Sequence, residues 1–159
     1  MQAAATATSE TPGEAAPACG AAAPAARPTL DGADVLVVDD YQDCREMYAA
    51  WLSLAGFRVL TAGSGVEALK LAREFLPSII LMDLCLPGID GCEVTRQLKA
   101  DRATRHIPVI ALTALSPPSP SRLATIGFES IILKPCLPDD LADHLARVLG
   151  SRRPISSDC

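Results

Sequence analysis

Short apolar runs alternate with longer amphipathic stretches over the central part of the chain. The runs occupy residues 35–38, 57–62, 78–83, 107–113 and 130–134, and most of them are apolar at every position between the first residue and the last. Strands of this kind are buried on both faces, as they are in parallel sheets. The pattern therefore predicts five parallel strands.

Between these runs, apolar residues recur every three or four positions, which is the period of an amphipathic helix. Helices are predicted over 42–55, 64–76 and 137–149, and another begins at Asp90. A Ser-x-x-Glu capping box opens the second of them. Strands joined by helices, with right-handed crossovers, predict an α/β fold of the (βα)5 type: a doubly wound parallel sheet covered by helices on both faces.

The fourth helix is expected to be shortened or disrupted. The stretch that should contain it carries Pro117, Pro118 and Pro120, and proline inside a helix removes a hydrogen-bond donor and clashes with the preceding turn. We predict a loop from Ser116 to Pro120 and at most two helical turns, ending at Ile126. The alternative is a helix that merely starts late, at Pro120.

The two ends of the chain differ from its centre. Residues 1–32 are rich in Ala and Pro, carry Arg27 as their first basic residue, and lack the large apolar content of a core. We predict a disordered leader over 1–32, one domain over 33–150 and a short flexible tail over 151–159. Because so few residues follow Gly150, no output domain is expected at that end.

Composition narrows the classes of function. The net charge is −5 and no basic stripe is present, which argues against a nucleic-acid partner. No apolar run approaches the ~18 residues of a membrane span, so no membrane association is expected. The six cysteines form no Cys-x-x-Cys pair, which favours reduced thiols in a cytoplasmic protein.

Polar side chains gather where the predicted strands end. Asp39 and Asp40 follow the first strand, Asp83 ends the third, Thr113 ends the fourth and Lys134 ends the fifth. Ligands of doubly wound sheets bind outside the carboxyl ends of the strands. The sequence therefore places a functional site at this edge.

The carboxylates in this group predict a cation. Two carboxylates about 4 Å apart repel by about 4 kcal/mol at an effective dielectric constant of 20, and Lys134 alone cannot balance three of them. Carboxylate oxygens, a carbonyl and water suit Mg²⁺. A carboxylate held beside Mg²⁺ and a lysine can attack phosphorus to form an acyl phosphate, and the Thr113 hydroxyl can donate to a phosphoryl oxygen.

The stretches "VLVVDD", "LMDLCLPGIDG", "ALTA" and "LKP" occur in this order and spacing, and together they resemble the receiver (CheY-like) domain of bacterial two-component response regulators. The resemblance covers about residues 33–150. It implies the strand order 2-1-3-4-5. It also implies a phosphorelay signalling protein that is not an enzyme in the ordinary sense, since only its own phosphorylation and dephosphorylation are self-catalysed. Its partners would be a histidine kinase or histidine phosphotransfer protein and a downstream target protein.

The resemblance also implies a role for each site residue. Asp83 would accept the phosphoryl group. Asp40 would bind Mg²⁺ directly, Asp39 would bind it through water, and the backbone carbonyl of Cys85 would complete the protein ligands. Thr113 would be the switch hydroxyl.

Lys134 would contact the phosphoryl group, and its bond to Pro135 is expected to be cis. Pro87 and Gly88 would belong to the loop after the phosphorylation site.

Three further positions depart from the family pattern. Ile131 stands where the family usually has an aromatic switch residue, so coupling between that aromatic and Thr113 is in question. Cys85 and Leu115 stand where other receivers carry polar side chains that guide the hydrolytic water. We therefore predict slow loss of the phosphoryl group.

Two other functions are compatible with parts of the pattern. A phosphorylation-independent docking domain (a pseudo-receiver) would keep the fold, and the proline-rich fourth helix and Ile131 leave this alternative open. A haloacid-dehalogenase-like phosphatase also uses a Mg²⁺-bound aspartate. Its first strand, however, ends in an Asp followed by a second Asp two residues later, whereas Tyr41 occupies that position here.

Overall fold

The computed structural model describes residues 34–114 and 119–151 of the chain, and within them strands and helices alternate. The elements are β1 (Asp34–Val38), α1 (Gln42–Leu54), β2 (Arg58–Ala62), α2 (Gly65–Phe75), β3 (Ile79–Asp83), α3 (Gly91–Ala100), β4 (Val109–Thr113), α4 (Pro120–Ile126), β5 (Ser130–Leu133) and α5 (Pro138–Gly150). The predicted (βα)5 order is confirmed.

The five strands form one parallel sheet in the order β2-β1-β3-β4-β5. The order reverses at β1, so β2 lies on one side of it and β3 on the other. In register, Val38 of β1 lies beside Ala62 of β2 and Met82 of β3. The carboxyl ends of β1 and β3 are therefore adjacent, which brings the residues that follow them to one place.

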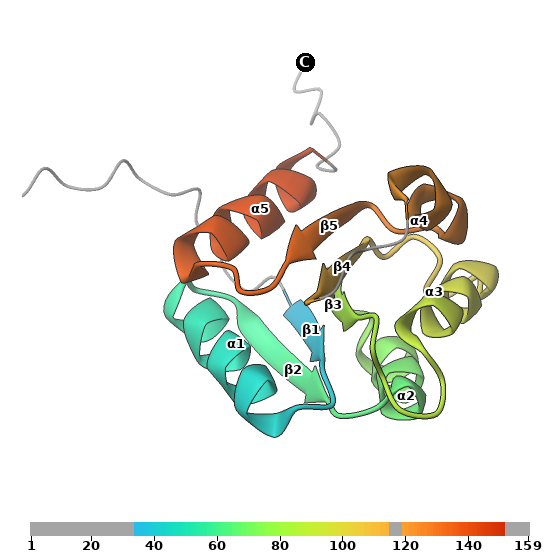
Figure 1. The fold of residues 1–159 in the computed structure, drawn as a ribbon, viewed down its shortest axis with the longest axis horizontal. Coiled ribbons are helices and arrows are strands. Elements are labelled where there is room, and N and C mark those ends of the chain that lie inside the picture. Colours follow the sequence, from blue (N-terminus) through green and yellow to red (C-terminus); the bar gives the residue numbers. More distant parts are fainter. Residues whose placement is uncertain (1–33, 115–118, 152–159) are drawn as a thin grey trace, which may run out of the picture.

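Helices cover both faces of the sheet, with α1 and α5 on one side and α2, α3 and α4 on the other (Figure 1). The alternation of side chains along β1 and β3 separates two cores. Leu36, Val38, Ile80 and Met82 pack toward α2, α3 and α4. The odd-numbered residues of the same strands pack toward α1 and α5. Two buried faces explain why residues 35–38 of β1 and 79–82 of β3 are all apolar.

Several strands are shorter than predicted, for reasons that hydrogen bonding explains. The Phe57 amide donates to the Leu52 carbonyl at the end of α1, so β2 begins at Arg58. Pro108 has no amide to donate, and β4 begins at Val109. These differences leave the carboxyl ends of the strands where the sequence placed them, apart from β5, which ends at Leu133.

The fourth helix spans Pro120–Ile126, seven residues, which confirms the prediction of at most two turns. The helix begins at Pro120, as the late-start alternative predicted, so Pro120 is not the last residue of a loop. Proline fits there because its missing amide would have no partner in the first turn. The predicted loop residues 116–118, the leader over 1–32 and the tail beyond Ser151 lie outside the described residues.

Two helix starts behave as predicted. The Ser64 hydroxyl accepts from the Glu67 amide at 3.3 Å, and the Asp90 carboxylate accepts from the Glu93 amide at 2.7 Å. Gly56, with φ of 93°, follows α1 and turns the chain into β2. None of the described helices is both long and apolar enough to cross a membrane.

Candidate functional site

Asp39 follows the last residue of β1, and its polar groups are all engaged. Its amide donates to the Ala62 carbonyl at 3.1 Å. Its carboxylate accepts from the Tyr41 amide at 2.9 Å through Oδ1 and from the Lys134 ammonium at 2.5 Å through Oδ2. The side chain is 1% exposed. A buried carboxylate needs this degree of pairing, because burial without partners would be costly.

Asp83 ends β3, in the strand next to β1. Its Oδ1 accepts from the Cys85 amide at 2.9 Å, and its Oδ2 accepts from Lys134 at 2.6 Å. Asp39 and Asp83 thus share one pattern: each carboxylate binds the amide two residues later and turns the chain away from its strand. The carboxylates remain directed at the site edge of the sheet.

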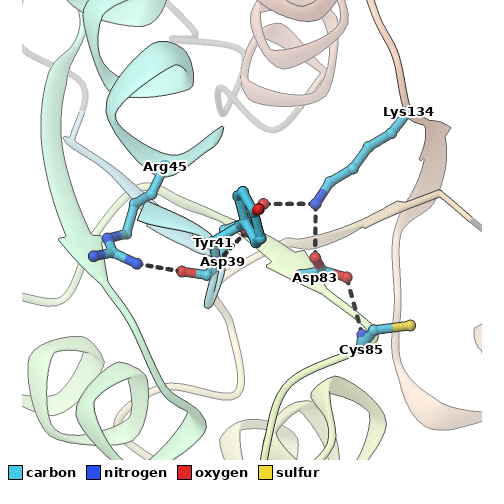
Figure 2. A network of polar contacts seen from close by, with 6 residues as sticks. All are labelled: Asp39, Tyr41, Arg45, Asp83, Cys85 and Lys134. Carbon is cyan, nitrogen blue, oxygen red and sulfur yellow. Dashed lines mark hydrogen bonds and ion pairs between the residues drawn. The ribbon is translucent and has the colours of Figure 1, made fainter. Parts of the chain in front are cut away.

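Lys134 follows β5 and reaches back to both carboxylates (Figure 2). Its own amide donates to the Thr113 carbonyl at 2.8 Å, and its bond to Pro135 is cis, as predicted. Burial acts to lower the pKa of the Lys134 ammonium. The hydrogen bonds and charges of Asp39 and Asp83 together outweigh burial, so the pKa lies above its ordinary value. The ammonium is therefore held in its charged form.

Asp40 completes a group of three carboxylates. Oxygens of Asp39, Asp40 and Asp83 all lie within 4.8 Å of one another. Asp40 is exposed, and among the described residues its carboxylate makes no hydrogen bond or ion pair. One ammonium against three carboxylates leaves an excess of two negative charges. Hard oxygen ligands that carry this excess charge fit Mg²⁺ in both ligand type and charge.

The other predicted site residues lie close by but in different surroundings. The Cys85 amide contacts Asp83, and the residue is exposed. Thr113 ends β4, is 2% exposed, and is tied to Lys134 through its carbonyl. The strand ends therefore bring Asp39, Asp40, Asp83 and Lys134 together, with Thr113 on the neighbouring strand.

The sequence did not point to two residues that shape this site. Arg45 in α1 donates from Nη1 to the main-chain oxygen of Asp39 at 2.6 Å. Gly91 at the start of α3 leaves no room for a side chain, because a Cβ there would lie 2.1 Å from the main-chain oxygen of Asp83. Contacts between a side chain or a glycine and backbone atoms produce no periodic pattern. Only the turn motif around Gly91 could have suggested its importance.

Ile131 occupies the central part of the edge strand β5 and is half-buried. It lines a hollow of about 320 Å³ between α4 and β5, together with residues that include Leu123 and Phe128. The short α4 and the absence of an aromatic ring at position 131 fall on the same side of the sheet. The departures seen in the sequence are thus adjacent in space.

Comparison with known proteins agrees with this geometry. The response regulator receiver domain family matches residues 35–146. The polar-differentiation response regulator DivK of Brucella abortus is 41% identical over 117 residues, which is 73% of this chain and 95% of DivK.

Solved structures show the same fold. The Vibrio cholerae chemotaxis protein CheY4 has a TM-score of 0.69 and 31% sequence identity, covering 73% of this chain and 98% of CheY4. The receiver domain of a Pseudomonas aeruginosa sensor histidine kinase also has a TM-score of 0.69 and 31% identity, covering 75% and 98% of the two chains. That domain was solved with a magnesium ion coordinated in its active-site cleft.

The family match spans nearly all of the described residues, and the DivK relative is matched over almost its full length. The fold agrees with that of the solved chemotaxis protein CheY4. This chain belongs to the response regulator receiver domain family.

Proposed function

We propose that the protein is a phosphorylation-dependent signalling switch that accepts a phosphoryl group on Asp83 in the presence of Mg²⁺. The observation that carries the proposal is the double contact of Lys134 with Asp39 and Asp83, beside the third carboxylate of Asp40. It supplies a nucleophile, a cation for phosphoryl oxygens and a metal-ligating group in one place.

The chemistry of Asp83 follows from its surroundings. A carboxylate oxygen attacks the phosphorus of a phosphohistidine, an O–P bond forms, and the P–N bond to the imidazole breaks. The Cys85 amide and the strand end hold the carboxylate in one orientation, which lowers the entropic cost of reaching the attacking geometry. Lys134, 13% exposed and charged, stabilises the negative charge on the transferred oxygens.

The remaining site residues would have supporting roles. Asp40 would bind Mg²⁺ directly, Asp39 would bind it through water, and the Cys85 carbonyl would contribute a further oxygen. Bound Mg²⁺ supplies neutralisation of the phosphoryl oxygens. The Thr113 hydroxyl would donate to the phosphoryl group on Asp83, so that phosphorylation biases the segment after β4.

The proposed partners follow from this chemistry. A histidine kinase or a histidine phosphotransfer protein would supply the phosphoryl group, and a downstream protein would bind the switched form. The half-buried Ile131 has no aromatic ring and cannot act as an aromatic switch. The signal would therefore pass through Thr113 and the chain that follows it. Slow hydrolysis of the phosphoryl group stays a prediction, and Leu115, on which it partly rests, lies outside the described residues.

The two alternatives are less well supported. A pseudo-receiver would have no need of the assembled cluster of three carboxylates and Lys134. A haloacid-dehalogenase-like phosphatase disagrees with the family match, and also with the position of the second aspartate after β1.

The proposal is tested by incubating the full chain with phosphoramidate, with and without Mg²⁺, and measuring intact mass. A mass increase of one phosphate that requires Mg²⁺ and does not form when a chelator is present during the incubation supports it. No increase in the wild-type protein would instead favour the pseudo-receiver. Turnover of p-nitrophenyl phosphate would favour the phosphatase.

A further inference from the structure

Arg45 occupies an unusual place next to the acidic cluster. It is the fourth residue of α1, and its Nη1 donates to the main-chain oxygen of Asp39 at 2.6 Å. Figure 2 shows the guanidinium reaching Asp39 from the side away from Asp83 and Lys134. Arg45 therefore makes no hydrogen bond to the side chain of Asp83 or Lys134. It holds the backbone of the segment that links β1 to α1.

The oxygen that Arg45 binds belongs to the peptide group linking Asp39 to Asp40. A peptide group is planar, so holding its oxygen restricts the direction in which Asp40 leaves the strand. The Asp40 carboxylate itself has no hydrogen-bond or ion-pair partner in the described part of the chain, so its direction is set through the backbone on either side of it. Two bonds hold this backbone: the Tyr41 amide donates to Asp39 Oδ1, and Arg45 donates to the Asp39 main-chain oxygen. Of the two, only the bond from Arg45 comes from a side chain that can be replaced without changing the aspartates.

A second observation concerns the turn after β2. A Cβ on Gly63 would lie 3.3 Å from Nη1 of Arg45, which is tighter than most Cβ contacts, and 3.5 Å from Cζ of Arg45, which is an ordinary contact. Gly63 is not among the glycines with positive φ, so its backbone conformation does not require glycine. The absence of a side chain at 63 provides room for the guanidinium instead.

The helix itself gains nothing from this arginine. A cation in the first turn of a helix faces the positive end of the helix dipole, which is unfavourable by a few tenths of a kcal/mol to about 1 kcal/mol. The favourable contact of Arg45 is with the end of β1. Its position is explained by the site and not by the helix.

We propose that Arg45 is a positioning residue for the Mg²⁺ site, acting by fixing the Asp39–Asp40 peptide group from the space that Gly63 leaves open. The proposal rests on the proposed function, because it assumes that Asp40 binds Mg²⁺. It predicts that replacing Arg45 changes the Mg²⁺ affinity in the direction opposite to that expected from the loss of its charge alone. Removing a nearby cation should strengthen Mg²⁺ binding, whereas losing the orientation of Asp40 should weaken it.

The test is calorimetric titration of Mg²⁺ into the full chain, as wild type, Arg45→Met, Gly63→Val and the double variant. We expect Arg45→Met to weaken Mg²⁺ binding about tenfold, the lower end of the range for residues that orient metal ligands. Gly63→Val keeps the charge and should weaken binding several-fold in the Arg45 protein. It should have little further effect in Arg45→Met, because the crowded neighbour is then absent.

Arg58→Met is the matched control. It removes an exposed arginine whose partner is Asp34, at the opposite end of β1 and β2, and should leave Mg²⁺ binding unchanged. Urea unfolding of each variant identifies any that fails to fold. Unchanged or tighter binding in Arg45→Met, or a Gly63→Val effect that is equal in both backgrounds, would overturn the role of Arg45. If the wild-type protein binds no Mg²⁺, both this inference and the proposed function are wrong.

Discussion

The Lys134 ammonium lies 2.6 Å from the Asp83 carboxylate, although 51 residues separate the two along the chain. The contact links the carboxyl end of β3 to the residue that follows β5, and β4 lies between these two strands in the sheet. It also sets the electrostatics of the site, because the same ammonium serves Asp39. One residue thus supports both the stability of the acidic cluster and its chemistry.

Replacing Lys134 with methionine should destabilise the protein. The exposures of the Lys134, Asp39 and Asp83 side chains are only 13%, 1% and 9%, so removing the cation leaves buried negative charge without compensation. We expect a loss of about 3 kcal/mol in the free energy of unfolding in metal-free buffer, measured by urea denaturation. Saturating Mg²⁺ should restore part of the loss. Lys70→Met, which alters an exposed lysine of α2, is the control and should leave stability unchanged.

Removing the Asp40 carboxylate should have the opposite effect on stability and strongly reduce phosphorylation. Asp40→Ala relieves repulsion within the cluster, so the variant should fold and be at least as stable as wild type without metal. It should show at least a tenfold loss of Mg²⁺-dependent phosphorylation by phosphoramidate. Asp43→Ala, at an exposed position of α1, is the matched control. Normal phosphorylation of Asp40→Ala would show that the two adjacent aspartates have been misinterpreted.

Gly91 should tolerate no side chain. The Cβ of alanine would lie 2.1 Å from the main-chain oxygen of Asp83 and 3.1 Å from Cα of Leu84, and backbone atoms at that distance must move. Gly91→Ala should cost about 3 kcal/mol or more, or prevent folding, as judged by circular dichroism and urea denaturation. Gly150→Ala meets no atom within 4 Å and should be neutral or slightly stabilising. Equal stability of the two variants would contradict the close approach of α3 to Asp83.

His144 should make stability fall on mild acidification. Its Nε2 lies 2.7 Å from the Ser130 hydroxyl on β5. Burial, with a smaller effect of the Arg147 cation, holds the pKa of His144 below its ordinary value of 6.5. The unfolded chain therefore binds a proton more readily than the folded one. The stability contributed by this residue is complete above pH 6.5 and is lost as the pH falls through the folded pKa.

The measurement is urea denaturation at about pH 7.5 and about pH 5.5. The decrease between the two should be smaller in His144→Gln, which has no ring to protonate. An identical decrease in both proteins would assign the pH dependence to other groups.

Much of the fold follows from patterns that the sequence states directly. The strand β3 is apolar until its last residue because both faces are buried, and Asp83 then marks the functional edge. For this reason the sequence alone predicts Asp39, Asp83, Thr113 and Lys134 at strand ends. The late start of α4 at Pro120 was also foreseeable from the geometry of proline.

The remaining features depend on contacts that have no period. The Arg45 guanidinium binds a main-chain oxygen. Every residue type carries such an oxygen, so the sequence gives no sign of this contact. The tight approach of Gly91 to Asp83 depends on how α3 is placed over the loop after β3. The first residue of β2 depends on whether the Phe57 amide donates to the sheet or to a carbonyl at the end of α1, and in the structure it donates to α1. Such contacts become visible only once the chain is folded.

The central claim is that Asp83 itself receives the phosphoryl group. The most direct test is to phosphorylate the full chain with phosphoramidate and Mg²⁺, reduce it with borohydride, and map the peptides by mass spectrometry. Borohydride converts an aspartyl phosphate to homoserine and leaves free carboxylates unchanged. We expect homoserine at position 83 alone, with Asp39 and Asp40 as unmodified internal controls. Homoserine at 39 or 40, or at no position, would contradict the account.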